Sequence, residues 1–139
     1  MDDELDEVLE DLDAGSCARL LEATHVGRMA VVDENGRPRI VVLNHLVHEG
    51  DIFFRTAEEA WLTRHLEGDG FDVVYEVDSF SHSSRTGWSV IAAGRLRIEQ
   101  DANLIALAHR QLEAWARGHR DVVLHLDVDV LTGRRVGLI

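Results

Sequence analysis

Residues 81–98, SHSSRTGWSVIAAGRLRI, form a polar loop that runs into an alternating apolar segment. Arg85 lies among two serines and a threonine, and Trp88 follows where the apolar alternation begins. A guanidinium group and several hydroxyl groups can satisfy the oxygens of an anionic ligand, and loops at strand ends carry many ligand contacts. The same residues also fit a surface turn whose tryptophan covers the core, so this segment alone leaves both interpretations open.

Histidine, cysteine and lysine chemistry has less support in the sequence. The eight histidines contain no pair four residues apart on one expected helix and no CxxC-type partner set, so the sequence predicts no metal site. Cys17, the single cysteine, is expected to be a half-buried apolar residue rather than a nucleophile. All fourteen basic residues are arginine, which excludes a lysine Schiff base.

The length and composition predict one folded domain. A chain of 139 residues with 45% hydrophobic residues can bury a core without metals or disulfides. The first 13 residues contain eight acids and no base, with leucine and valine at helical spacing. We therefore expect an acidic lead-in at residues 1–15, solvated or loosely helical, and a single domain at residues 16–139.

The charge and the hydropathy pattern restrict the partners. A net charge of −12 argues against nucleic-acid binding, which needs dense positive charge. We find no signal-peptide pattern and no apolar run of membrane-spanning length, and one cysteine cannot form an internal disulfide. We therefore expect a cytoplasmic protein with no nucleic-acid or membrane partner.

The periodicity of apolar residues predicts the elements that position these side chains. Asn35-Gly36 and the turn at residues 49–51 favour antiparallel hairpins. Ser16 and Asp101 are expected N-caps of helices. We predict strands at residues 28–33, 39–47, 52–56, 71–78, 88–99 and 121–136, and helices at residues 16–23, 57–67 and 102–117. Six strands with three helices at connections and ends indicate a small, mostly antiparallel barrel.

Three segments in this order resemble the small, actinobacterial-type members of the pyridoxamine 5'-phosphate oxidase-like family of flavin-binding split barrels. They are VGRMAVVDENGRPRIVVLNHLVHEGDIFFRTAEEAWL, VVYEVDSF and SRTGWSVIAAGRLRI. The similarity runs from about residue 20 to residue 136. It implies a mostly β fold, a six-stranded antiparallel split β-barrel with short peripheral α-helices. It also implies a homodimer that binds FMN, or the deazaflavin F420 in some branches, between its subunits.

The resemblance also implies which residues of this chain contact the cofactor. The strand beneath the isoalloxazine ring begins at Arg39 and ends near Asn44. The FRT motif with Arg55 and Thr56 corresponds to the phosphate contact. Trp61 stands where many relatives carry a phosphate-binding lysine, although its apolar helix face also fits a core or dimer contact. The remaining cofactor candidates, at the strand entry near the phosphate or ring, are Arg85, Trp88 and Ser89.

The predicted function is that of a flavin-binding oxidoreductase that transfers hydride to or from an unidentified small molecule, with FMN as cofactor and F420 as the alternative. A flavin carries the redox chemistry itself, so no catalytic residue is assigned. Relatives read FRTAPGTKL where this chain reads FRTAEEAWL, which replaces a cation and adds Glu58 and Glu59. This difference favours an alternative, a non-catalytic module that binds a flavin or heme-type ligand or has lost its cofactor. His45 and His82 fall near the implied groove.

Overall fold

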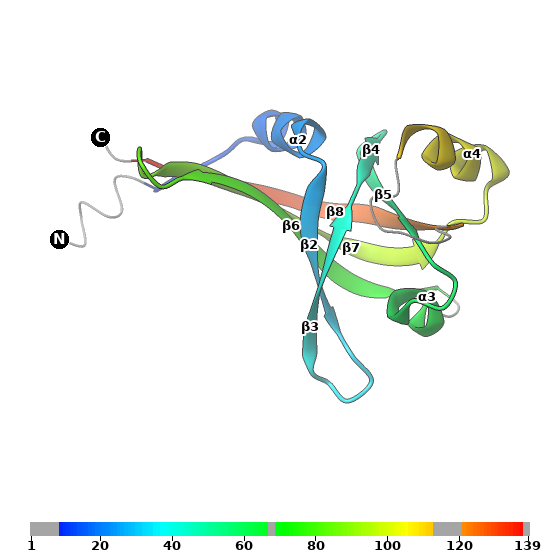
Figure 1. Cartoon of the computed structure of the whole chain (residues 1–139). Helices are drawn as coiled ribbons and strands as arrows, with labels where there is room; N and C mark the ends of the chain where they lie inside the picture. The colour runs from blue at the N-terminus through cyan, green and yellow to red at the C-terminus, as the bar shows by residue number, and fades with distance from the viewer. Residues whose placement is uncertain (1–8, 67–68, 113–120, 138–139) are drawn as a thin grey trace.

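The alternating apolar segments form strands in a computed structural model, which describes residues 9–66, 69–112 and 121–137 (Figure 1). The strands are β1 (Leu9–Asp11), β2 (Val26–Val32), β3 (Pro38–Asn44), β4 (Leu46–His48), β5 (Asp51–Thr56), β6 (Phe71–Ser81), β7 (Thr86–Ile98) and β8 (Val122–Val136). The helices are α2 (Ala14–Ala23), α3 (Trp61–His65) and α4 (Ala102–Gln111).

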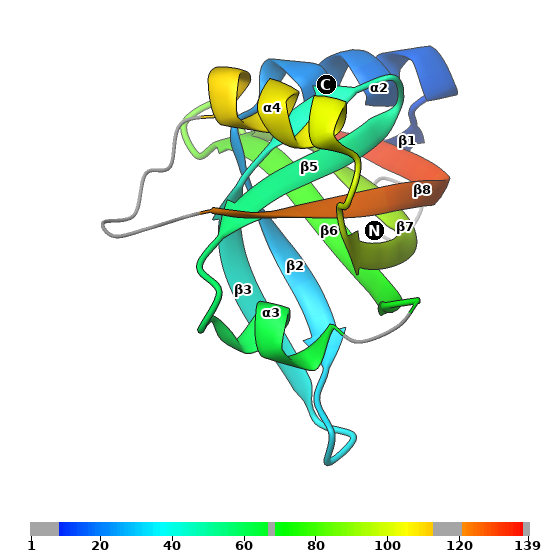
Figure 2. The same ribbon diagram turned by 90° about the vertical axis from the view of Figure 1, so that its right-hand side faces the viewer.

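The strands form one antiparallel sheet in the order β3-β2-β6-β7-β8-β5-β4, and β1 pairs with the C-terminal part of β8. The long strands β6, β7 and β8 curl, so the sheet makes an open barrel (Figures 1 and 2). Each pairing between described strands is antiparallel, as the hairpin turns predict. The prediction of a mostly β, antiparallel split barrel is therefore confirmed.

The described residues contain eight strands rather than the expected six. The expected strand at residues 39–47 is divided, because β3 pairs with β2 as far as Asn44 whereas β4 pairs with β5 from Leu46. The other additional strand is β1, so residues 9–11 of the acidic lead-in are extended rather than helical. Pairing with β8 satisfies the backbone groups that a helix would otherwise have satisfied internally.

The core lies on the concave face of the sheet. Alternate residues of each strand point inward, and Tyr75, Phe54 and Met29 are the largest fully buried side chains. Full burial of one such side chain contributes about 2–3 kcal/mol. A smaller apolar cluster lies under α4, where Phe53 and Val123 meet Ala108.

The helices differ from their predictions mainly at their ends. The N-cap of α2 is Asp13, because its carboxylate accepts a hydrogen bond of 2.7 Å from the backbone N–H of Ser16. Asp101 caps α4 as predicted. α3 has only five residues, because the chain at residues 57–60 forms a turn and Ala60 makes no side-chain cap. Residues 113–117 of the expected third helix lie outside the described residues.

Among the described residues, no helix has both the length and the apolar character needed to cross a membrane.

A row of apolar side chains crosses the convex face of the sheet. In antiparallel sheets, paired residues point to the same side. The pairs therefore place one apolar residue from each of five adjacent strands side by side on the solvent face. These residues are Ile40, Ala30, Val74, Ala93 and Val130. We call them the apolar row; Ile40 is 65% exposed and Val130 is 55% exposed.

Candidate functional site

Trp88 lies in a hollow at the end of the long β6–β7 hairpin. The hollow has a volume of about 310 Å³ and is lined by residues of β6, β7 and β8. Trp88 on β7 pairs with Ser79 on β6 and with Arg135 on β8. The three side chains therefore lie side by side on one face of the sheet. Ser81 and Thr86 lie one step further along the same face. One hollow thus combines a flat aromatic ring, hydroxyl groups and a guanidinium group, the groups that suit a flat anionic ligand.

Arg135 is the functional candidate that the sequence analysis missed. It lies near the end of β8, 47 positions after Trp88, and only the β7–β8 pairing brings the two residues together. The paired arginines in the segment LTGRRV were the available signal. That signal has meaning only once the register is known, because a shift by one residue would place Arg134 beside Trp88 instead.

Arg85 lies on the turn that joins β6 to β7. Its backbone has a positive φ of 54°, and its side chain is exposed. The side chains of Ser84 and Thr86 share a hydrogen bond of 2.7 Å across the same turn. The loop in the structure is shorter than the one predicted from the sequence, because β6 extends to Ser81 and β7 begins at Thr86. Arg85 is therefore the exposed neighbour of Thr86, which lines the Trp88 hollow.

Arg39 and Trp61 form a second group of predicted site residues. The guanidinium carbon of Arg39 lies 4.5 Å from the centroid of the Trp61 ring, a cation–π contact. The His65 ring also stacks on the Trp61 ring, with ring centroids 4.3 Å apart and an interplanar angle of 22°. Oε2 of Glu34 lies 3.3 Å from Nε2 of His65. Trp61 thus packs against Arg39, and a lysine at this position would add a second cation beside that guanidinium.

Arg55 and Thr56 end β5. Thr56 is 7% exposed, so its hydroxyl offers little surface to a ligand within one chain. One nitrogen of Arg55, Nη1, donates a hydrogen bond of 2.9 Å to the carbonyl of Leu112 after α4. Arg55 is half-buried, and this contact ties the end of β5 to the end of α4.

The predicted site residues fall into separate groups within one chain. The β6–β7 ladder runs from Phe71, near α3, to Ser81, near the hollow. Ten residue steps along a strand span about 30 Å. Figure 1 shows α3 and the β6–β7 turn at opposite ends of this hairpin. One chain therefore does not bring the group at Arg39 and Trp61 to the group at Trp88.

Asn44 and Ser89 point to the convex face of the sheet. Ser89 pairs with Asp78, and Arg28 on that face donates hydrogen bonds to Asp78 at 2.9 Å and to Glu76 at 3.1 Å. The pKa of Glu76 is raised, by its burial and by the neighbouring Asp78 carboxylate. This part of the convex face is therefore polar, in contrast to the apolar row.

His45 is a buried member of the core rather than a groove residue. It is 4% exposed, and its Nδ1 lies 2.6 Å from the Tyr75 hydroxyl. Its Nε2 lies 3.3 Å from the carbonyl oxygen of Leu21, and the Tyr75 hydroxyl donates a hydrogen bond of 3.0 Å to the carbonyl of Leu43. Burial lowers the pKa of His45 and raises the pKa of Tyr75. His82, in contrast, lies exposed on the β6–β7 turn.

We expect the protein to lose stability as the pH falls below about 6.5, the pKa of an unfolded histidine. Because burial lowers the pKa of His45 in the folded state, the unfolded state binds more protons in this range. The stabilisation is therefore present above pH 6.5 and is lost as the pH falls towards the lowered pKa. The free energy of unfolding in urea, measured at pH 7.5 and at pH 5.5, tests this expectation. The difference between the two values should be smaller in the His45→Gln variant than in the parent protein.

The exposed His82 provides the control for this experiment. His82→Gln should show the same difference between the two pH values as the parent protein. A His45→Gln protein with the parent's pH dependence would show that the titrating group lies elsewhere.

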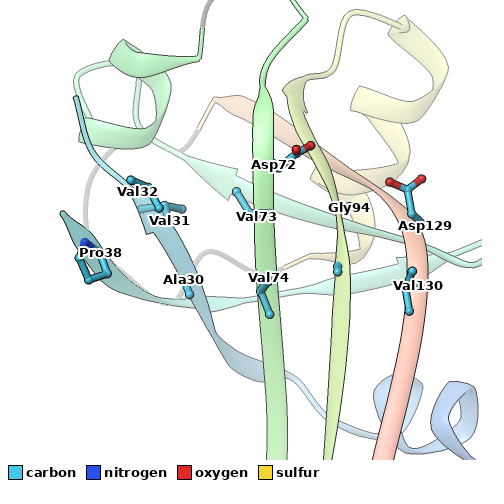
Figure 3. Close-up of a pocket in the computed structure, with 11 residues that line it drawn as sticks. Ala30, Val31, Val32, Pro38, Asp72, Val73, Val74, Gly94, Asp129 and Val130 are labelled. Atoms are coloured by element: carbon cyan, nitrogen blue, oxygen red, sulfur yellow. The ribbon is translucent and has the colours of Figure 1, made fainter. Parts of the chain in front are cut away.

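A second hollow, of about 450 Å³, lies around the apolar row. Figure 3 shows Val32 and Pro38 on one side of it, Val74 in the middle and Val130 on the other side, with the carboxylates of Asp72 and Asp129 at its rim. Two carboxylates repel an anionic group, so this hollow suits an apolar surface rather than a phosphate.

The curled antiparallel sheet and the open barrel place this protein among the split β-barrels. Residues 13–135 match the family model described as pyridoxamine 5'-phosphate oxidase. The chain belongs to this family.

Individual relatives support the same assignment. The protein Rv0080 of Mycobacterium tuberculosis is 33% identical over 133 residues, which cover 94% of this chain and 86% of that protein. A FAD binding protein of Mycobacterium smegmatis is 26% identical, with a TM-score of 0.70 over 91% of this chain and 97% of the other. A FAD and heme binding protein of the same organism, 13% identical, shares the fold, with a TM-score of 0.69 over 94% of this chain and 73% of the other.

Proposed function

We propose that this protein binds a flavin, with the Trp88 hollow as part of the site, and that the flavin exchanges hydride with a small molecule. The observation that carries the proposal is the combination of Trp88, Arg135 and hydroxyl groups in one hollow of a split barrel. The guanidinium and the hydroxyl groups would bind the phosphate, and Trp88 would pack beside the ring. FMN is the cofactor we favour and F420 the alternative, and the similar FAD binding protein adds FAD. The single, buried Cys17 agrees with a cytoplasmic location.

We propose further that the protein acts as a homodimer. Two groups of site residues about 30 Å apart can contact one flavin only if a second copy contributes one of them. The apolar row supplies a surface for that copy, because monomeric proteins rarely expose contiguous apolar patches of this kind. A two-fold dimer would cover the row in both copies at once.

The absorbance of the purified protein and titration with cofactors test the flavin proposal. We expect absorbance near that of an oxidised flavin, or saturable binding when FMN, FAD or F420 is added to colourless protein. Anaerobic bleaching of the bound flavin by a hydride donor tests the transfer of hydride. Protein that binds none of the three cofactors would contradict the proposal.

The dimer proposal predicts that Ile40→Glu dissociates the protein. Ile40 is 65% exposed in one chain, so the change should leave the core intact, whereas a carboxylate buried in an interface would be strongly unfavourable. Light scattering at micromolar concentration should give twice the chain mass for the parent and the chain mass for the variant. Arg37→Glu, on the exposed β2–β3 turn, is the control and should remain dimeric. A monomeric parent would contradict the dimer and the shared site together.

The second candidate function is a binding module without catalysis, for a flavin or heme-type ligand or with the cofactor lost. The exposed carboxylates of Glu58 and Glu59, after the FRT motif, favour it because they repel a phosphate. A heme Soret band without flavin binding would support this candidate. If the protein binds a flavin and no hydride donor reduces that flavin, the result would support a flavin-binding module without catalysis.

A further inference from the structure

A cluster of titratable side chains lies on the convex face of β5, β7 and β8, beside α4. His125 is at its centre and is 6% exposed. Its Nε2 lies 2.8 Å from Oδ2 of Asp51 and 3.3 Å from Oδ1 of Asp127. These three residues each direct one possible ligand atom into the same space, within 4.8 Å of one another. The cluster lies on the opposite face of the sheet from the Trp88 hollow.

Every one of these three side chains is oriented by a further hydrogen bond. Oδ1 of Asp51 accepts a hydrogen bond of 3.0 Å from the backbone N–H of Val128, which leaves Oδ2 directed at His125. Oδ2 of Asp127 accepts one of 2.8 Å from Nε of Arg97, which leaves Oδ1 directed at His125. Such outer contacts are the usual means by which proteins orient metal ligands.

Glu99 orients the imidazole of His125 in the same way. Its Oε1 lies 2.7 Å from Nδ1 of His125, and its other oxygen accepts the backbone N–H groups of Gln100 and Asp101 at 3.0 and 3.1 Å. Nδ1 of His125 also lies 3.0 Å from Nη2 of Arg97, so the ring is held between a carboxylate and a guanidinium group. These two contacts orient the imidazole and leave Nε2 directed at the two aspartates.

The other ring nitrogen then has to face two carboxylates. Nε2 lies 2.8 Å from Oδ2 of Asp51 and 3.3 Å from Oδ1 of Asp127. Both carboxylates attract a cation at this point, either a proton on Nε2 or a metal ion bound to it.

We propose that His125 Nε2, Asp51 and Asp127 bind a divalent transition-metal ion, with zinc as the best match to one nitrogen and two oxygen ligands. Metal–ligand bonds of about 2.1 Å at angles of 90–110° place two ligand atoms about 3.0–3.4 Å apart. The separation of His125 and Asp127, 3.3 Å, fits this range. Asp51 needs to move away by a few tenths of an ångström, since its 2.8 Å contact suits a bridging proton.

The charge and the accessibility of the cluster suit such an ion. With neutral His125, the carboxylates of Asp51, Glu99 and Asp127 and the guanidinium of Arg97 sum to −2, which one divalent cation neutralises. Asp127 is 43% exposed and borders a polar hollow of about 410 Å³, so an ion and its remaining water ligands can enter. The centroid of the Phe53 ring lies 4.3 Å from that of the His125 ring, and Phe53 also packs with Ala108 of α4, so apolar side chains cover the cluster on the side of α4.

Calorimetric titration of the full chain with zinc chloride tests the proposal, in parallel with thermal melting. We expect one zinc site in the parent, and a fall in affinity of about tenfold or more in Asp127→Asn and Glu99→Gln. Zinc should also raise the melting temperature of the parent more than that of either variant. Asp129→Asn removes an exposed carboxylate from the same strand and should bind zinc as the parent does.

The other histidines can bind zinc weakly, so the comparison between variants is decisive. Circular dichroism of each metal-free variant confirms its fold before titration. Equal zinc affinity in the parent and in Asp127→Asn, or no zinc binding by the parent, would overturn the proposal. The result does not depend on whether the protein binds a flavin.

Discussion

Replacement of Arg135 by alanine is expected to weaken flavin binding by about tenfold to a hundredfold, the value of one or two charge-assisted hydrogen bonds. Arg135 lines the hollow beside Trp88, and its side chain is exposed, so the change removes a cation and leaves the core intact. Titration of FMN into the parent and the variant measures the effect. Unaltered melting would show that the fold survives.

Two arginine variants serve for comparison. Arg85→Ala should weaken binding to a smaller extent and more steeply as salt increases, because Arg85 lies exposed on the β6–β7 turn next to the hollow residue Thr86. Arg37→Ala removes an exposed cation from the β2–β3 turn and should have no effect. If Arg135→Ala binds FMN, FAD and F420 as the parent does, the phosphate binds elsewhere.

Trp88→Ala separates binding from stability in the same hollow. Trp88 is half-buried and packs against the main core, so its loss should lower both cofactor affinity and the free energy of unfolding, the latter by about 2 kcal/mol. Loss of stability with unaltered cofactor affinity would make Trp88 a purely structural residue at the edge of the core.

A large loss of stability is expected for Gly94→Ala. A Cβ atom at position 94 would lie 1.9 Å from the backbone carbonyl oxygen of Asp127 on β8. Because a backbone atom of a central strand cannot move aside cheaply, we expect a loss of about 3 kcal/mol and a fall in melting temperature of about 10 °C. Urea unfolding and thermal melting measure both quantities.

Gly137→Ala is the matched control, since a Cβ there would meet nothing within 4 Å. It should change the free energy of unfolding by less than about 0.5 kcal/mol. Gly94 lies where the β7–β8 register shifts, between the pairs Ala93–Val130 and Gly94–Val128. A Gly94→Ala protein as stable as the parent would mean that this irregularity relaxes without cost.

Most elements of the fold could be predicted from the sequence, because the period of the apolar residues reports directly which segments can be strands or helices. The turns at Asn35-Gly36 and at residues 49–51, and the cap at Asp101, depend on backbone preferences of single residues and were predicted correctly. The ends of elements were predicted less well. Asp13 rather than Ser16 caps α2, and β3 ends before His45, because tertiary partners decide these boundaries.

The candidate sites depended much more on the tertiary structure. Trp88 and Arg85 could be recognised within one segment, since they are close in sequence. Arg135 joins Trp88 only through the β7–β8 register, and His125 meets Asp51 across 74 positions of the chain. No short-range pattern contains such pairs.

The sequence by itself thus determined the fold class, the antiparallel hairpins and the family, all of which follow from local periodicity and from motifs in order. Only the tertiary structure decided which side chains lie together: Arg39 on Trp61, Arg135 beside Trp88, and His125 among its carboxylates. The physical reason is that strand period and turn type are properties of neighbouring residues. Register and sheet curvature, in contrast, depend on the burial of the whole core, and they determine the distances between residues far apart in sequence.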